Sequence, residues 1–302
     1  MIIKASSAQI VDNGIGDIYG VPAGVTFLLA QGSGETFPGG PNLTRVLNSG
    51  TSETFNLVEG NLIFTDQGTN TTLILGNGNT NLTSSKGGEH ATLGNGTQTV
   101  SLAGNSNILH TGNTTAGTSR ITTTGNGNTI ATGDGSVSVT TNGANDTVTL
   151  GNGSDSMYIG NGHVGPTNDI VKLGNGTTNA ITTYAGGNKI YGGTGLTFIS
   201  ETSTNNTVVV NAAGGTVSFG WNYSLASNDH ADLTQILAGE GGVTAANIAN
   251  FVSINLNGSN GVIPVITVKG LGGTATINLV TQKTAVSLTT LLNNNFFVLP
   301  AH

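Results

Sequence analysis

The sequence predicts an all-β protein built around a parallel β-solenoid, or β-roll, with a period of about 18 residues per coil. One observation is a Gly-Asn-Gly turn that recurs at Leu75–Gly78, Leu93–Gly96, Leu150–Gly153, Ile159–Gly162 and Leu173–Gly176. The other is its even spacing, since Gly76, Gly94 and Gly112 each lie one period apart and Gly160 follows Gly151 by half a period. Each coil is therefore expected to contain two short strands and two tight turns.

The residues between the turns have the pattern of strands with one buried face. Asp146–Leu150 and Ser156–Ile159 alternate in the period of two that a half-buried strand requires. Glycine and asparagine fit the corners because they tolerate the positive φ angles of sharp turns. Stacked coils would satisfy the hydrogen bonds of each strand and bury a narrow row of small aliphatic side chains.

The composition also fits a repeat protein. The 302 residues include 48 glycines, while only 8% of the chain is charged and 5% is aromatic. Disorder is the alternative, but the regular alternation of Val, Ile, Leu and Thr in a chain with so few charges disfavours it.

Charge and hydropathy exclude several classes of partner. The net charge is −7, and the eight Lys and Arg residues are spread from Lys4 to Lys283, so we expect no nucleic-acid partner. No apolar run approaches the ~20 residues of a membrane helix, so no membrane insertion is expected. Met1–Ser7 does not lead into the apolar segment of a cleaved secretory signal. The absence of cysteine excludes disulfides, thiol catalysis and thiolate metal sites.

We divide the chain into three regions, of which residues 1–70 are the first. Strand-like runs at Gly24–Ala30 and Asn56–Phe64 predict an N-terminal β cap or assembly region. A solenoid needs a cap because an exposed terminal coil presents unpaired backbone groups to other chains. If the N-terminal strands of one molecule complete the last coil of the next, a head-to-tail fibre results.

Residues 71–218 form the predicted β-roll, interrupted by a loop at 162–168, and residues 219–302 form a small α+β domain. In the latter, Asp229–Ala238 has apolar residues at helical spacing, and Thr244 is expected to cap a second short helix. Strands are predicted at Val252–Leu256, 262–268 and Ala275–Leu279, before an apolar patch at Phe296–Leu299.

Two blocks resemble the repeats-in-toxin family of bacterial proteins, which are exported by type I secretion. Leu150–Tyr158 follows the family's Gly-Gly-x-Gly-x-Asp-x-aliphatic-x repeat without its first glycine, and Thr141–Thr149 keeps Asp146 and Val148. The segment from Asp229 onward, including Gly242–Ile248, resembles the uncleaved export region of such proteins. The resemblance implies a parallel β-roll that binds calcium in its turns and folds outside the cell. It also implies the type I secretion machinery as a partner and an extracellular or cell-surface location.

Calcium binding is restricted by the small number of carboxylates. In the family, the sixth-position Asp ligates calcium between turns on the same side of the roll, whereas Asp146 and Asp155 are only nine apart and would face opposite sides. Thr80 and Gln98 stand where other turns would need a carboxylate. Since calcium prefers six to eight oxygen ligands, a full ladder of sites is excluded. What remains is an asparagine-ladder roll that needs no metal, or a few calcium sites at the four aspartates Asp134, Asp146, Asp155 and Asp169.

No motif for catalysis is present, so we expect no enzymatic activity. The five histidines form no zinc-binding pair; they are His90, His110, His163, His230 and His302. Asp229 and Asp232 could suggest glycoside chemistry, but they lie at a predicted helix start, where capping is the simpler role. Trp221 and Tyr223, at the junction with the last region, are expected to plug the core.

The sequence favours a non-enzymatic, secreted bacterial surface or matrix protein that self-assembles into filaments, sheets or an S-layer-like coat. If calcium binds, folding and metal binding are expected to be one equilibrium. The alternative is an adhesin or a module that binds ice or carbohydrate, including a cell-surface glycan. Threonine groups at Thr122–Thr124, Thr147/Thr149 and Thr182–Thr183 raise it, although they do not recur at one fixed place in every coil. A polysaccharide-active enzyme would need a carboxylate cluster in a groove.

Overall fold

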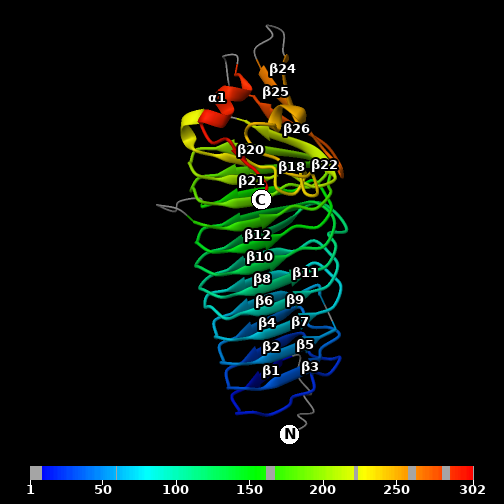
Figure 1. Cartoon of the computed structure of the whole chain (residues 1–302). Coiled ribbons are helices and arrows are strands. Elements are labelled where there is room, and N and C mark those ends of the chain that lie inside the picture. Colours follow the sequence, from blue (N-terminus) through cyan, green and yellow to red (C-terminus); the bar gives the residue numbers. More distant parts are fainter. Residues whose placement is uncertain are drawn as a thin grey trace. The chain divides into compact units, whose positions relative to one another are not determined.

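The computed structural model confirms an all-β parallel solenoid of about 11 turns with about 18 residues per turn. It describes residues 9–58, 60–160, 167–220, 224–257, 263–280 and 286–301. The chain divides into two compact units, Met1–Thr147 (unit 1) and Val148–His302 (unit 2). Figure 1 shows the strands of both units, coloured by their position in the sequence. Among the described residues, no helix has the length and apolar character needed to cross a membrane.

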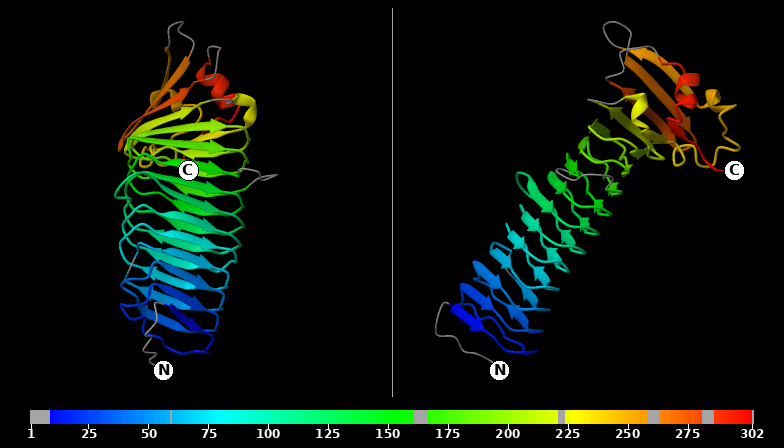
Figure 2. Two further views of the ribbon diagram at one scale, coloured as in Figure 1. Left: turned by 180° about the vertical axis from the view of Figure 1, so that it is seen from behind. Right: turned by 90° about the vertical axis from the view of Figure 1, so that its left-hand side faces the viewer.

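Unit 1 consists of two parallel sheets whose strands alternate along the chain (Figure 2). The strands of its first sheet are, in spatial order, β1 (Gln9–Asp12), β2 (Phe27–Ala30), β4 (Arg45–Asn48), β6 (Ile63–Asp66), β8 (Asn81–Ser84), β10 (Thr99–Leu102), β12 (Ser119–Thr123) and β14 (Val137–Thr141). Those of its second sheet are β3 (Thr36–Gly39), β5 (Thr54–Leu57), β7 (Thr72–Leu75), β9 (His90–Leu93), β11 (Ile108–Thr111) and β13 (Thr129–Ala131), and β15 (Thr147–Thr149) crosses the division.

The coils extend into the region that the sequence predicts as a separate cap. Phe27 pairs with Arg45, Arg45 with Ile63 and Ile63 with Asn81, so the register of the coils continues unchanged across residue 70. The expected change of architecture is absent from the described part of residues 1–70. Its coils turn at Gly14, Gly32, Gly50 and Gly68, which also lie one period apart but lack the Gly-Asn-Gly sequence.

The core of unit 1 is a column of alternate side chains between the sheets. Phe37 stacks on Phe55 with ring centroids 4.9 Å apart, and Phe55 meets Phe64 edge to face at the same distance. All three rings are fully buried. The stacking distance is close to the separation of neighbouring strands, so identical residues at one position of successive coils form continuous apolar rows.

Unit 2 also contains two sheets and adds antiparallel strands. The strands of one sheet are, in spatial order, β16 (Ser156–Ile159), β18 (Thr178–Thr183), β20 (Leu196–Glu201), β22 (Gly214–Phe219), β26 (Gly273–Leu279), β25 (Ile263–Gly270) and β24 (Val252–Asn257). Those of the other are β17 (Ile170–Lys172), β19 (Lys189–Tyr191), β21 (Thr207–Val209), β23 (His230–Asp232) and β27 (Phe297–Val298). The short helices are η1 (Leu225–Ser227), η2 (Ile248–Asn250) and α1 (Leu288–Asn293).

The strands predicted for residues 219–302 are confirmed, but the prediction of a helix at Asp229–Ala238 is wrong. Within Asp229–Ala238, residues 230–232 form strand β23 and the following residues form turns. Leu233, Ile236 and Leu237 are buried there without a regular helix. Thr244 is also not the expected cap, because its N–H and hydroxyl both donate to Asn247 Oδ1. Within the second predicted helix only the short η2 forms.

Several features named in the sequence analysis lie outside the described residues. They are the end of the Ile159–Gly162 turn, most of the 162–168 loop, Trp221, Tyr223, Val262, His163 and His302.

Candidate functional site: a polar ladder inside the coils

A row of polar side chains runs inside the solenoid at one corner. It is formed by the residue immediately before each strand of the second sheet of unit 1. Because side chains alternate along a strand, this residue points inward with the apolar residue two positions later, as Glu35 does with Phe37. The members in unit 1 are Glu35, Glu53, Thr71, Glu89, Asn107, Asn128 and Asp146, all buried. We call this row the inner ladder.

Hydrogen bonds between successive coils connect the inner ladder. The Asn107 N–H donates to Asn128 Oδ1 at 3.0 Å, and the Asn128 N–H donates to Asp146 Oδ1 at 2.7 Å. The Glu35 N–H donates to Glu53 Oε2 at 2.9 Å in the same way. In these three steps a side-chain oxygen accepts from the backbone of the preceding coil, which fixes the stacking distance and satisfies a buried N–H.

Unit 2 contains the same arrangement. The Asp169 N–H donates to Asn188 Oδ1 at 2.9 Å, and the Asn206 N–H donates to Asp229 Oδ1 at 2.7 Å. Between them, the Asn188 N–H donates to Asn206 Oδ1 at 3.2 Å. Asp229 therefore accepts a coil-to-coil bond rather than capping a helix.

The asparagine members use both ends of their amide. Asn128 Nδ2 donates to the Gly125 carbonyl at 2.9 Å, and Asn188 Nδ2 donates to the Ala185 carbonyl at 2.6 Å. These carbonyls lie in the turn that precedes each asparagine. One side chain therefore ties its coil to the neighbouring coil and closes its own turn.

The glutamate members lack that amide donor. Both carboxyl oxygens of Glu35 and both of Glu89 are buried and accept no hydrogen bond from an N–H or hydroxyl donor, and the same is true of one oxygen each of Glu53 and Asp12. Asp66 lies in this group but accepts from Asn48 Nδ2 at 2.8 Å. We call the set of Asp12, Glu35, Glu53, Asp66 and Glu89 the acidic corner. No Lys, Arg or His of the described residues forms an ion pair with it.

Burial keeps these glutamates protonated at higher pH than usual. Burial, together with the charges of Glu53 and Asp12, raises the pKa of Glu35 to about 8. Burial also raises the pKa of Glu53. For Glu89, burial and the neighbouring Asp66 raise the pKa well above its ordinary value. In each case the charged form is disfavoured because water is removed and no cation replaces it.

The four aspartates predicted to bind calcium occupy separate kinds of position. Asp146 and Asp169 are buried members of the inner ladders, and Asp155 is buried just before β16. Asp134 is exposed at a corner, where its N–H donates to Asn113 Oδ1. The described residues contain no group of three or more His, Asp and Glu side chains that could hold a metal ion. Burial raises the pKa of Asp146 to about 6, although the hydrogen bonds from Asn128 oppose the shift. Calcium binding stays a prediction.

The expected asparagine ladder is present at the exposed corners. The Asn95 N–H donates to Asn77 Oδ1 and the Asn113 N–H donates to Asn95 Oδ1, both at 2.8 Å. In unit 2 the Asn175 N–H donates to Asn152 Oδ1 at 2.8 Å. The asparagines of the Gly-Asn-Gly turns therefore connect neighbouring coils directly.

A row of hydroxyl side chains lies on the outer face of the first sheet of unit 1. Thr65 pairs in register with Thr83, and Ser101 pairs in register with both Thr83 and Thr122. Thr122 in turn pairs with Thr140. As expected, the row does not extend through every coil, because Val11, Leu29 and Leu47 occupy the same register position in β1, β2 and β4. From β6 to β14 the position is a hydroxyl residue in each strand. We call these five residues the hydroxyl row.

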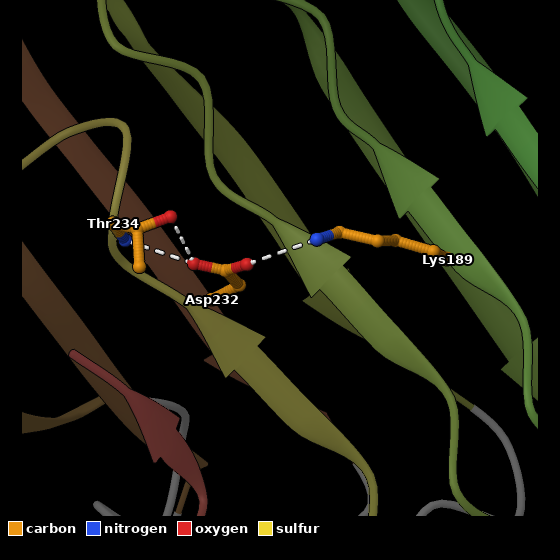
Figure 3. Close-up of polar contacts among 3 residues, drawn as sticks. All are labelled: Lys189, Asp232 and Thr234. Carbon is orange, nitrogen blue, oxygen red and sulfur yellow. Dashed lines mark hydrogen bonds and ion pairs between the residues drawn. The ribbon is translucent and has the colours of Figure 1, made fainter. Parts of the chain in front are cut away.

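One ion pair in unit 2 links β19 and β23, two strands that lie on either side of β21 (Figure 3). Lys189 Nζ lies 3.6 Å from Asp232 Oδ2, while Asp232 Oδ1 accepts from the N–H of Thr234 at 2.9 Å and from its hydroxyl at 2.5 Å. The Lys189 ammonium also lies 5.4 Å from the centre of the Tyr191 ring. Because the side chain of Lys189 is 44% exposed, this pair contributes little to stability and has a local role.

Sequence reasoning missed the acidic corner because it followed the Gly-Asn-Gly turns. The signal was a second repeat, Gly32-Ser-Gly-Glu-Thr-Phe37 and Gly50-Thr-Ser-Glu-Thr-Phe55, whose two copies lie one period apart.

Comparison of the chain with protein-family models, curated proteins and solved structures gives no match in any of the three.

Proposed function

We propose that this protein is a non-enzymatic structural component of a bacterial surface or matrix that assembles with copies of itself through its end coils. The observation that supports this most directly is the first described coil of unit 1. Strand β1 has a described partner, β2, on one side only. Three large apolar side chains are exposed on the same coil: Val11 (52%), Ile15 (84%) and Ile18 (65%).

On one side, the backbone of this first coil is hydrogen-bonded to the second coil. The Gln31 N–H donates to the Asp12 carbonyl at 2.8 Å and the Thr36 N–H donates to the Asp17 carbonyl at 2.9 Å, both from the second coil. On the other side, no strand of the described residues pairs with β1. A parallel edge that has no partner among the described residues, beside exposed apolar side chains, is suited to strand addition from another molecule.

The interior supports a structural role. The inner ladders and the corner asparagines connect each coil to the next, and such a stack transmits load along its axis. With 8% charged residues, neighbouring molecules repel one another weakly. Extracellular location, type I secretion and calcium rest on the resemblance of Leu150–Tyr158 to the repeats-in-toxin nonapeptide and of the segment from Asp229 onward to the family's export region. These three properties are part of the proposal and do not follow from the geometry of the structure.

The experiment is negative-stain electron microscopy and light scattering of the full chain, with and without calcium. The test variant is Ile15→Lys with Ile18→Lys, and the control is Leu271→Lys, which changes an equally exposed leucine (75%) in unit 2. We expect filaments or sheets from the wild type and the control, and monomers from the double variant. Monomers from the wild type at high concentration, with and without calcium, would contradict the proposal.

The hydroxyl row favours a second candidate function, a binding face for ice or for a polysaccharide. Thr65, Thr83, Ser101, Thr122 and Thr140 come from five successive strands about 4.8 Å apart, and neighbouring outward residues of one strand are about 6.7 Å apart. A regular array of hydroxyls can order water or match repeating sugar hydroxyls. Arg120, which stands beside Thr122 on the same face, interrupts the array.

Thermal hysteresis and pull-down with insoluble polysaccharides test this candidate. Thr83→Tyr with Thr122→Tyr should abolish the activity, because bulky rings disrupt a flat face. The control, Thr54→Tyr, places a tyrosine ring on the outer face of the second sheet and is expected to leave the binding activity unchanged. No thermal hysteresis and no polysaccharide binding by the wild type would exclude this candidate.

A further inference from the structure

The acidic corner brings carboxyl groups of successive coils together in the interior of unit 1. Glu35 and Glu53 occupy the same position of neighbouring coils, and Glu53 Oε2 accepts the Glu35 N–H. Glu53 Oε1 and both oxygens of Glu35 remain buried without a donor. Asp12 lies beside Glu35, and Asp66 lies beside Glu89.

The turns are shaped to hold these carboxyl groups. A Cβ atom on Gly32 would lie 1.7 Å from Glu35 Oε1, and one on Gly50 would lie 2.4 Å from Glu53 Oε1. The space above each glycine is therefore filled by the carboxyl group three residues later. Any other residue at Gly32 or Gly50 would displace the glutamate, so glycine and glutamate act as a unit in both coils.

The neighbours offer no compensating positive charge. The groups that face Glu35 are Asp12, Asp17, Glu53 and the Tyr19 hydroxyl, and the last donates to Asp17 Oδ2 at 3.1 Å. Glu53 also faces Asp66, and Glu89 faces Asp66 and Ser84. All of these are acidic or neutral. An ionised carboxylate in such surroundings is strongly destabilising unless a proton or a cation neutralises it.

We propose that the acidic corner is a proton-binding site that acts as a pH-operated lock on the N-terminal coils. Glu35 shares protons with its neighbours Glu53 and Asp12. Separately, the protonated carboxyl group of Glu89 donates a hydrogen bond to Asp66. In the protonated state, each shared hydrogen supplies the donor that asparagine supplies elsewhere in the inner ladder. After deprotonation, like charges face one another across adjacent coils. The lock operates whether or not the ends of the molecule assemble.

The direction of the effect follows from linkage. The folded-state pKa of Glu35 is about 8, above the ordinary value of 4.5, so the folded chain binds more protons than the unfolded chain between these values. The stabilisation is fully present below about pH 4.5 and is lost as the pH rises through about 8. This is opposite to the usual carboxylate, which is paired in the folded state and whose protonation in acid destabilises a protein.

Hydrogen exchange of the full chain between pH 5 and 9, corrected for the intrinsic exchange rate, tests the lock. For residues 9–70 we expect at least about a tenfold loss of protection in the wild type over this range, the factor that corresponds to one pKa unit. Glu35→Gln with Glu53→Gln should remove that loss, since the amide keeps the acceptor oxygen and supplies a fixed donor. The matched control, Glu240→Gln, changes a half-buried glutamate of a turn in unit 2 and should behave like the wild type.

Infrared spectroscopy of the wild type gives an independent readout that does not depend on the variant folding. A protonated carboxyl band should persist at pH 7 and lose intensity as the pH rises through about 8, the pKa of Glu35. Absence of that band at pH 7 would overturn the proposal, as would equal protection at pH 5 and pH 9. Restoration of protection at pH 8 by added calcium, with release of protons, would also overturn it, because the occupant would then be a metal ion.

Discussion

The same position of the inner ladder is occupied by carboxyl groups in the acidic corner and by amides further along unit 1. Glu35 and Asn107 both contribute a buried N–H to a side chain of the next coil. Only the asparagine also donates, to the carbonyls of Ala103 and Gly104 in its own turn. The two residues therefore differ in the donor and not in the bond that their N–H makes to the next coil, and in our proposal the missing donor makes the N-terminal coils depend on pH.

The largest effect is expected from removing an asparagine at the centre of a ladder. Asn188 accepts from the N–H of Asp169 and donates to the carbonyl of Ala185, and it is fully buried. Asn188→Leu should lower the free energy of unfolding by about 3 kcal/mol or more, because several buried groups lose partners. Asn175→Ala, at an exposed corner, should cost less than about 1 kcal/mol. Equal losses in urea unfolding would show that the two ladders are equivalent.

A smaller effect is expected when an asparagine of the inner ladder is replaced by an aspartate. Asn128→Asp removes the donor to the Gly125 carbonyl and places a second carboxyl group beside Asp146. We expect a loss of about 2 kcal/mol at pH 8 and a smaller loss at pH 4, where both groups are protonated. Thermal unfolding at the two pH values measures the difference, and a loss independent of pH would refute the role given to charge.

The reverse exchange, Asp146→Asn, should be mildly stabilising. The raised pKa of Asp146, about 6 against 3.8, means that its ionisation opposes folding as the pH rises through this window. Asparagine keeps the acceptor for the Asn128 N–H and carries no charge. We expect about 1 kcal/mol of added stability at pH 7 and none at pH 3. Destabilisation at pH 7 only in the presence of calcium would instead indicate that Asp146 ligates the metal.

The sequence predicts the solenoid well because turns and strand alternation are local signals. Gly76, Gly94 and Gly112 reveal the period directly, and Asn77 and Asn95 form the expected ladder. The acidic corner is harder to predict, because Asp12 and Glu35 are distant in sequence and meet only when coils stack. The false helix at Asp229–Ala238 has a related cause: Leu233, Ile236 and Leu237 are buried at helical spacing in a turn that follows β23.

The smallest change in stability is expected from Glu89→Gln, which removes the ability of the side chain to ionise but keeps a hydrogen-bond donor. Burial and the neighbouring Asp66 raise the pKa of Glu89 well above its ordinary value, so Glu89→Gln replaces the donor of a protonated carboxyl with an amide donor. At pH 5 the variant and the wild type should have the same stability within about 0.5 kcal/mol. As the pH rises above the ordinary pKa of a glutamate, the variant should become relatively more stable, because glutamine cannot ionise and the wild type must either keep its proton or bury a charge. Thermal unfolding at pH 5 and pH 9 decides, and a variant that is less stable at both values would show that Glu89 makes a contact that an amide cannot reproduce.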